Sequence, residues 1–356
     1  MSNVFSKAPR TSLWIALFLL ACGCRSRDNA GRADKSEASR PTSPASVTGA
    51  SRNREWTGEK TMEGLRLVRS FSTVLDGTAG LAVDGRNRCY VAHDKGVAVF
   101  DENGERLGGW EVEGGAVCVD VGDVGDNGDD GDVGDDGRLV LCGPSTVSIY
   151  DAEGVLKERW GEEGEGQGEF RLITGVALTE GMVFLADAGN RCVHRFAVTG
   201  DFANDLGRKG ETEGQGIICP SPYLDCDVDE EGRLHVTNPG RFRIDVMASD
   251  GRPLFHWGKP GVERGFFHGC CNPTHLCLLP GGRTAAALKR PPGILVFDRA
   301  EKGKEPRLLA WADPPVFSKE DQGLDLAGDA ENRLWALDVG AGAVFLFALE
   351  LDGEEN

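Results

Sequence analysis

The sequence lacks an excess of positive charge and has little apolar sequence that runs without interruption. Its 356 residues include 39 Lys and Arg against 57 Asp and Glu, which gives a formal net charge of −18. An acidic surface repels the phosphates of nucleic acids and anionic lipid headgroups, so neither is expected as a partner. The apolar run LWIALFLL at residues 13–20 is too short for a mature transmembrane helix, which needs about 20 apolar residues.

Motifs that identify an enzyme are also missing. The chain has no G-x-S-x-G nucleophile turn, no H-E-x-x-H zinc motif and no phosphate-binding loop. The sequence therefore carries no specific catalytic signature. We predict no catalytic residue and no cofactor, with Ca²⁺ or Zn²⁺ as the weaker alternatives.

The first residues have the pattern of a secretory signal peptide. Lys7 and Arg10 form a basic start, the short apolar run follows, and the small residue Ala21 comes next. This order of basic, apolar and small residues predicts cleavage before Cys22.

Residues 19–22, Leu-Leu-Ala-Cys, resemble a bacterial lipobox. The resemblance implies that a signal peptide of residues 1–21 is removed and that Cys22 is acylated, so that lipid alone holds the protein in the membrane. A soluble secreted protein is the alternative. Because Gly23 rather than Asp follows the cysteine, we expect the outer membrane of a bacterial cell envelope rather than the inner membrane.

Residues 22–60 are poor in large apolar side chains. They are rich in Arg, Ser, Pro, Ala and Asn, and Trp56 is the one large apolar residue. Such a segment cannot bury enough apolar surface to offset its loss of conformational entropy, which predicts a disordered tether. The folded part is then residues 61–356, long enough for one substantial domain.

The folded part is built from a repeat. Two copies are GLAVDGRNRCYVAH at 80–93 and GLDLAGDAENRLWALD at 323–338, and each continues to a third apolar run. A fourth run often ends at tryptophan, as at Trp110, Trp160, Trp257 and Trp311. Four short strands in each unit, separated by Gly, Asp and Asn turns, are typical of a propeller blade. Six such units predict an all-β fold, a six-bladed β-propeller.

The sixth unit ends after its third strand, so its fourth strand must come from elsewhere. The segment RLVRSFS at 66–72 precedes the first unit and has the length and character of a strand. We expect it to join the last blade. Closing the ring with strands from both ends would remove the open sheet edge that invites aggregation.

The segment at 164–196, GEGQGEFRLITGVALTEGMVFLADAGNRCVHRF, resembles an NHL repeat. It has the Gly-rich lead, the GVAL strand and the ADAGN-R turn of that family. The resemblance covers about residues 66–350 and is strong only in this copy. It implies an NHL-like propeller, a fold used by binding modules, scaffolds and a few enzymes, so it does not choose a function.

Six D-x-G triplets follow one another at 120–137, an insertion in the second unit. Closely spaced carboxylates could bind Ca²⁺ weakly. The spacing lacks the D-x-D-x-D-G run and the final Glu of an EF-hand, so a flexible acidic loop is the favoured interpretation. The candidate calcium ligands are Asp126, Asp129, Asp130 and Asp132.

Cysteine and histidine gather in FFHGCCNPTHLC at 266–277. In a propeller this segment would lead into the first strand of blade 5, at the mouth of the central channel. The segment ICPSPYLDC at 218–226 repeats its C-x₂-P-x₃-C spacing in blade 4. A disulfide between the blades or buried thiols are favoured in an oxidising compartment, and a transition-metal site or a redox-active vicinal pair are the alternatives. The candidates are Cys219, Cys226, Cys270, Cys271, His275 and Cys277.

The turns between second and third strands would share this face of the propeller. Their polar side chains could bind a ligand, hold a metal ion that activates water, or simply form the turns. The candidates are His93, Asp94, Asp187, Asn190, Arg191, Asn238, Arg241, Lys289, Arg290 and Asp338.

These observations predict a membrane-anchored binding or scaffold lipoprotein that presents one face to a protein, a peptide or a glycan. One alternative is a metal-dependent hydrolase or lyase at the channel mouth. Another is a metal- or redox-handling protein that uses the cysteines of blades 4 and 5. An enzyme should have a deep channel with converging carboxylates and histidines, whereas a binding module should have a broad and shallow face.

Overall fold

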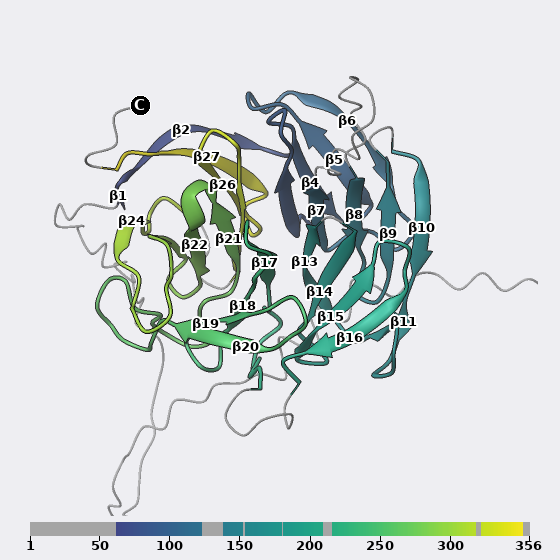
Figure 1. The fold of residues 1–356 in the computed structure, drawn as a ribbon. Helices are drawn as coiled ribbons and strands as arrows, with labels where there is room; N and C mark the ends of the chain where they lie inside the picture. Colours follow the sequence, from purple (N-terminus) through teal and green to yellow (C-terminus); the bar gives the residue numbers. More distant parts are fainter. Residues whose placement is uncertain are drawn as a thin grey trace, which may run out of the picture.

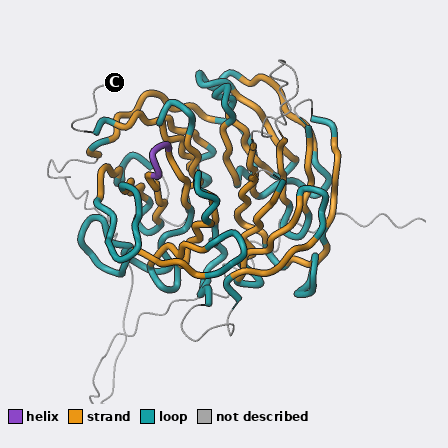
Figure 2. Tube along the Cα trace, viewed as in Figure 1, coloured by secondary structure: helices purple, strands orange, loops and turns teal. Residues whose placement is uncertain are grey.

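We describe the protein from a computed structural model, which places residues 62–122, 138–151, 154–179, 181–208, 216–317 and 322–351. Within these ranges nearly all regular structure is strand, and the single helical turn is the 3₁₀ segment Pro280–Gly282 (Figure 2). No helix among them is long and apolar enough to cross a membrane. The predicted signal peptide, the tether with Cys22 and the four candidate calcium ligands lie outside the described residues.

Six antiparallel sheets surround a central axis, which confirms the six-bladed β-propeller (Figure 1). Within a blade, strands that follow one another in the sequence pair with one another. The first strands of neighbouring blades contact each other all round the ring. Each first strand therefore lines the centre, and each fourth strand lies at the outer rim.

The strands of the first three blades run from the centre outwards in sequence order. Blade 1 contains β3 (Gly80–Val83), β4 (Cys89–His93), β5 (Gly96–Phe100) and β6 (Arg106–Glu111). Blade 2 contains β7 (Cys118–Gly122), β8 (Arg138–Cys142), β9 (Val147–Tyr150) and β10 (Leu156–Trp160). Blade 3 contains β13 (Ile173–Thr179), β14 (Met182–Asp187), β15 (Cys192–Ala197) and β16 (Phe202–Leu206). Between blades 2 and 3 lies a small parallel pair, β11 (Glu162–Glu163) and β12 (Glu169–Phe170).

Of the last three blades, blades 5 and 6 include strands from the N-terminal part of the described chain. Blade 4 contains β17 (Cys226–Val228), β18 (Leu234–Asn238), β19 (Arg243–Met247) and β20 (Pro253–Trp257). Blade 5 contains β21 (Leu276–Leu279), β22 (Arg283–Leu288), β23 (Gly293–Phe297) and β24 (Leu308–Ala312), with β1 (Met62–Glu63) as a fifth strand. Blade 6 contains β25 (Leu324–Gly328), β26 (Arg333–Asp338), β27 (Ala343–Leu349) and β2 (Leu65–Ser72).

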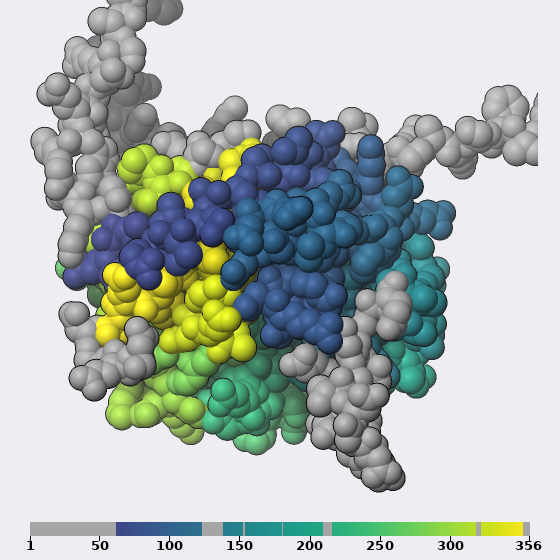
Figure 3. All heavy atoms as spheres, turned by 90° about the horizontal axis from the view of Figure 1, so that it is seen from above, coloured from purple at the N-terminus to yellow at the C-terminus, as the bar shows by residue number. Residues whose placement is uncertain are grey.

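The ring is closed by strands from both ends of the described chain. The predicted strand at 66–72 is confirmed: β2 pairs antiparallel with β27, with Phe71 opposite Val344. Figure 3 shows the N-terminal segment in purple beside the C-terminal strand in yellow on the outer surface. The sequence did not predict that β1 also pairs with β24 of blade 5, with Met62 opposite Ala312. The N-terminal segment therefore holds two neighbouring blades together.

The second and third strands of a blade are buried on both faces because neighbouring blades cover them. In blade 1, β4 reads CYVAH and β5 reads GVAVF, and every residue in both strands is buried. The fourth strand β6, RLGGWE, is mostly exposed. In blade 1 the third run is therefore continuously apolar, whereas the fourth run carries charges.

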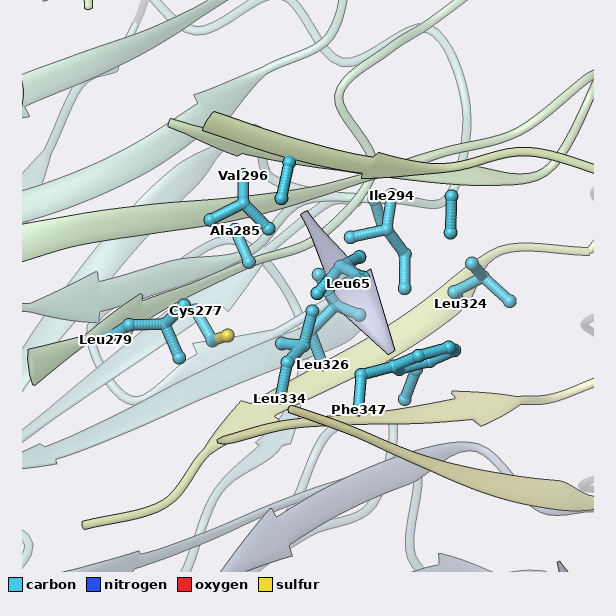
Figure 4. Packing of buried hydrophobic residues seen from close by; sticks show 14 of the residues in the cluster. Leu65, Cys277, Leu279, Ala285, Ile294, Val296, Leu324, Leu326, Leu334 and Phe347 are labelled. Atoms are coloured by element: carbon cyan, nitrogen blue, oxygen red, sulfur yellow. The ribbon is translucent and has the colours of Figure 1, made fainter. Parts of the chain in front are cut away.

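Apolar clusters fill the spaces between neighbouring blades. One cluster joins Cys277 and Ile294 of blade 5 to Leu326 and Phe347 of blade 6, and Leu65 of β2 packs into it (Figure 4). Each large apolar side chain that is fully buried contributes about 1.5–3 kcal/mol to stability. The N-terminal strand is thus part of the core as well as part of the sheet.

Glycine lets the first strands approach one another closely. A Cβ at Gly80 in β3 would lie 2.7 Å from Cα of Cys118 in β7, and a Cβ at Gly175 in β13 would lie 2.9 Å from Cα of Asp225. Backbone atoms cannot move away without separating the strands. These glycines therefore set how narrow the centre of the ring is.

Candidate functional site

The first strands enclose a central cavity of about 180 Å³. Its described lining combines small and apolar residues with four aspartates, and no Lys, Arg or His is among these residues. The aspartates are Asp120 in β7, Asp225 just before β17, Asp227 within β17, and Asp325 in β25. No positive charge in the lining balances these carboxyl groups, so their hydrogen bonds and their protonation decide what the cavity can do.

Each channel aspartate accepts a hydrogen bond from the main chain of the next first strand. The bonds run from Leu178 N to Asp120 Oδ2 at 2.6 Å, from Leu276 N to Asp225 Oδ2 at 2.9 Å, from Leu278 N to Asp227 Oδ2 at 2.7 Å, and from Leu81 N to Asp325 Oδ2 at 2.7 Å. The carboxyl groups therefore join blade 2 to blade 3, blade 4 to blade 5, and blade 6 to blade 1.

Burial raises the pKa of these carboxyl groups, because it removes the water that would stabilise their charge. The pKa of Asp120 rises to about 8 through burial and the nearby carboxyl of Asp227, and burial raises the pKa of Asp227 to about 6. Burial also raises the pKa of Asp225 and that of Asp325. Near neutral pH the raised pKa of Asp120 therefore keeps a proton in the cavity, whereas Asp227, with a pKa of about 6, is largely ionised.

One group of possible metal ligands occurs in the described part of the chain, and it lies in blade 3 rather than in the channel. The ligand atoms of Cys192, His194 and Asp205 lie within 4.8 Å of one another. His194 is fully buried, with Nδ1 2.6 Å from Asp205 Oδ1 and Nε2 3.3 Å from Asp187 Oδ2. Burial alone would lower the pKa of His194, but its hydrogen bonds to Asp187 and Asp205 raise that pKa to about 11. A protonated imidazole that donates to two carboxylates has no lone pair for a metal ion, so this group braces the blade.

Three of the predicted face residues form the turns on which they lie. Asp187, Asn238 and Asp338 end the second strands of blades 3, 4 and 6, and all three are buried. Their side-chain oxygens accept main-chain hydrogen bonds, as from Leu172 N to Asp187 Oδ1 at 3.0 Å and from Ile218 N to Asn238 Oδ1 at 3.0 Å. These side chains are committed to the scaffold.

Other predicted residues divide between scaffold and surface. Asn190 donates to the Gly164 carbonyl at 3.0 Å, and Arg241 donates to the Gly216 carbonyl at 3.1 Å. His93 is buried in blade 1, where Nδ1 accepts from the backbone N–H of Lys95 at 3.3 Å. The exposed members of the predicted set are Asp94, Arg191 and Arg290.

Five further predicted residues meet at the channel mouth over blades 4 and 5, together with Tyr223. We call this group the mouth cluster, and it consists of Cys219, Tyr223, Cys270, Cys271, His275 and Lys289. The rings of Tyr223 and His275 meet edge to face with centroids 5.8 Å apart, and Lys289 Nζ lies 4.3 Å from the centre of the Tyr223 ring. Cys219 Sγ donates to the Tyr223 carbonyl at 3.2 Å. The structure thus brings four of the six predicted cysteine-cluster residues together and adds Tyr223 and Lys289.

Lys289 is the unusual member of the mouth cluster. Its side chain follows directly after β22 and is only 8% exposed. Within the described residues its ammonium contacts the Tyr223 ring but has no carboxylate or hydrogen-bond partner. Burial lowers the pKa of Lys289, and the sulfurs of Cys271, Cys270 and Cys219 act in the opposite direction. A nearly buried charge without a partner is costly to a fold and is typical of functional sites.

His275 adds a polar atom without a partner, because its imidazole has a backbone hydrogen bond at Leu324 but its Nδ1 has none among the described residues. It is 7% exposed, and its Nδ1 is buried without a hydrogen bond to any described residue. Burial, and then the charge of Lys289, lowers the pKa of His275 to about 4. The imidazole is therefore neutral at physiological pH, and its Nδ1 can accept one further hydrogen bond.

The cysteines of the cluster differ in exposure. None of the described cysteines is disulfide-bonded, so the predicted disulfide between Cys219 and Cys270 or Cys271 is not confirmed. Cys270 is exposed and Cys271 is buried, and their sulfurs are 3.0 Å apart. Cys226 and Cys277 lie on the first strands β17 and β21, where both are buried. The predicted cysteine cluster is thus one vicinal pair at the mouth, with buried thiols around and below it.

Sequence analysis missed the channel aspartates and Tyr223. A signal for the aspartates was present, because each interrupts a strand-like apolar run, as in VCVDV at 117–121 and GLDLAG at 323–328. A carboxyl group in such a run indicates a side chain that faces the central cavity or accepts hydrogen bonds between blades, rather than one in an apolar interface between blades. Tyr223 carried no comparable signal, since its place beside Lys289 depends on the packing of two blades.

No protein-family model matches the sequence, and no curated protein matches it. Solved structures do match. A protein of unknown function from Bacteroides thetaiotaomicron is 15% identical, with 80% of this chain and 75% of that chain covered and a TM-score of 0.53. A gluconolactonase from Xanthomonas campestris is 17% identical, with coverage of 79% and 89% and a TM-score of 0.51.

An enzyme of another class has a similar fold. A catalytically inactive virginiamycin B lyase from Staphylococcus aureus, solved with quinupristin, is 12% identical, with 80% of this chain and 99% of that chain covered and a TM-score of 0.51. The likeness is one of fold. At these identities it supports the six-bladed propeller and transfers neither activity to this chain.

Proposed function

We propose that this chain is a lipid-anchored binding protein of the bacterial cell envelope. Its mouth face would bind an anionic group on a protein, a peptide or a glycan. Acylated Cys22 would hold it at the membrane, with residues 22–60 as the tether and the NHL-like propeller as the binding domain.

The unpaired ammonium of Lys289 carries this proposal. Removing a charge from water without a partner costs several kcal/mol, and a bound carboxylate or phosphate would recover that cost by pairing with it. Arg191 extends the positive region, because its guanidinium is exposed and its charge acts on Cys219. In a protein with a net charge of −18, a positive site of this kind favours an anionic ligand over a cation.

The other members of the mouth cluster suit ligand binding better than hydrolysis. Tyr223 offers an aromatic edge, and the neutral His275 offers one hydrogen bond. A metal-dependent hydrolase or lyase would need several ligand atoms converging at the mouth. The three-ligand group of the described residues lies in blade 3 instead, and its imidazole is occupied by two carboxylates.

Binding of acidic probes to the purified folded chain tests the proposal. The probes are a fluorescently labelled oligoglutamate peptide and an oligogalacturonate, with oligoglutamine and a neutral maltooligosaccharide as comparators. We expect at least one acidic probe to bind, and Lys289→Met to weaken that binding about tenfold or more, which corresponds to about 1.4 kcal/mol. Fluorescence polarisation or calorimetry measures the affinity.

Lys304→Met is the matched control. Lys304 lies in the connection between β23 and β24, on the opposite face of blade 5, and it pairs with Glu301. We expect this variant to bind like the wild type. Equal loss in both variants, or no binding of either acidic probe, would contradict an anion site at Lys289.

A further inference from the structure

The vicinal pair Cys270 and Cys271 is held in place at the mouth. Their sulfurs are 3.0 Å apart, and the next residue, Asn272, is fully buried. Asn272 Nδ2 donates to the carbonyls of His268 and Lys289, at 2.6 and 3.0 Å, and Asn272 Oδ1 accepts from Lys289 N at 2.9 Å. Asn272 thereby ties His268, which precedes the two cysteines, to the main chain of Lys289 in blade 5.

The two thiols differ in the way that an exchange reaction requires. Cys270 is exposed and can meet a reagent from solution, whereas Cys271 is 6% exposed and faces Cys270. The Lys289 ammonium lies within electrostatic reach of both sulfurs. The thiolate is the nucleophilic form of cysteine.

We infer that Cys270 and Cys271 form a thiol–disulfide exchange site whose substrates are organic disulfides. The Cys270 thiolate attacks one sulfur of the substrate disulfide and forms a mixed disulfide, and the other substrate sulfur leaves as a thiolate that takes up a proton. The Cys271 thiolate then attacks the Cys270 sulfur and releases the second substrate thiol. Two cysteine thiols are oxidised to one vicinal disulfide, and one substrate disulfide is reduced to two thiols.

The product should be readily reduced again. Adjacent Cα atoms are about 3.8 Å apart, closer than the roughly 4.4–6.8 Å usual for a disulfide, and departures from that geometry make the bond easier to reduce. The pair would therefore cycle between its two states rather than serve as a permanent link. This chemistry does not depend on the anionic ligand proposed above.

The other thiols near the mouth are not equipped for exchange. Cys219 Sγ donates to the carbonyls of Ser221 and Tyr223, at 2.8 and 3.2 Å, and burial raises its pKa to about 12. Burial also raises the pKa of Cys277 well above its ordinary value. Thiols in these states are poor nucleophiles near neutral pH, so among the described cysteines the reaction should be confined to the vicinal pair.

Oxidised glutathione is the probe for this inference. The reduced full chain is incubated with it, and intact mass and tandem mass spectrometry of the peptide around residues 265–283 report the products. We expect the wild type to lose two hydrogen masses, with the link mapped to Cys270 and Cys271, and to regain them with dithiothreitol. We expect Cys271→Ser to accumulate one glutathionyl group on Cys270, because the resolving thiol is absent.

Cys270→Ser is the paired control, and it should remain largely unmodified because the remaining thiol is buried. Far-UV circular dichroism and the unfolding midpoint check that both variants fold, and the wild-type mapping stands without them. A wild type that keeps a stable glutathionyl group on Cys270, reacts at the other described cysteines, or does not react at the pair overturns the inference. So does a folded Cys271→Ser variant that accumulates no mixed disulfide.

Discussion

Replacing Asp120 by Asn should change the pH dependence of stability more than stability itself. The Asp120 carboxyl accepts from Leu178 N at 2.6 Å and from Val121 N at 2.8 Å, and burial raises its pKa to about 8. An amide keeps one acceptor oxygen and never ionises. The variant therefore loses one hydrogen bond but also loses the cost of a buried charge.

The size and sign of the effect follow from proton binding. The unfolded chain releases the Asp120 proton near pH 4, whereas the folded protein keeps it up to about pH 8. Between these values the folded state binds more protons, so wild-type stability falls as the pH rises, by up to about 1.4 kcal/mol per pH unit. Near pH 5, Asp120→Asn should cost about 1 kcal/mol for the lost hydrogen bond. Between about pH 5 and pH 8, the free energy of unfolding of the variant relative to that of the wild type should rise by as much as roughly 4 kcal/mol.

Urea unfolding followed by tryptophan fluorescence measures this difference at several pH values between about 5 and 8. Asp120→Ala is the companion variant, because it removes both acceptors and should cost about 2–4 kcal/mol near pH 5. If the wild type and Asp120→Asn lose stability in parallel over this range, the carboxyl is ionised throughout and the interpretation of the channel as a protonated brace is wrong.

Two further predictions concern the ring and the anchor. Gly80→Ala should lower the free energy of unfolding in urea by about 1–3 kcal/mol, because its Cβ would lie 2.7 Å from Cα of Cys118. Gly108→Ala on β6 is the control and should be nearly neutral, because a Cβ there meets nothing within 4 Å. Equal losses in the two variants would contradict the close approach of β3 and β7. Cys22→Ser should move the full-length protein, expressed in a bacterium, from the membrane fraction to the soluble fraction on immunoblots, because no other lipid attachment is proposed. A variant that stays with the membranes would show that the anchor is not the acylated cysteine.

The fold was predictable because a blade repeats and its pattern is local. Period-2 runs and Gly, Asp and Asn turns predicted four strands in each unit, and the missing fourth strand of blade 6 pointed to the segment at 66–72, now seen in β2. The short strand β1 was not predictable in this way. It has two residues, and its pairing with β24 depends on the position of blade 5 beside the end of the chain.

The site was less predictable because the same residue types serve the scaffold and the surface. Asp187, Asn238 and Asp338 had the composition of a binding ring, but each ends a second strand and is buried there. A polar side chain at the end of a strand satisfies main-chain groups whether or not a ligand exists. The sequence therefore indicated which loops face the mouth but not which of their side chains are committed to turns.

Blade 5 departs from this scheme, and the departure explains why the mouth cluster lies there. In blades 3 and 4 the last residue of the second strand accepts main-chain hydrogen bonds from the loop that leads into the first strand, as Asp187 and Asn238 do. In blade 5 the second strand ends at Leu288, and the roles are reversed. The side chain that makes the hydrogen bonds is that of Asn272 in the leading loop, and it binds the main chain of Lys289. The Lys289 side chain therefore does not hold the leading loop, and it lies against Tyr223, beside the cysteine pair. Departures from a local rule are expected at functional sites, and in blade 5 the difference from blades 3 and 4 accompanies both the ammonium without a hydrogen-bond partner and the cysteine pair.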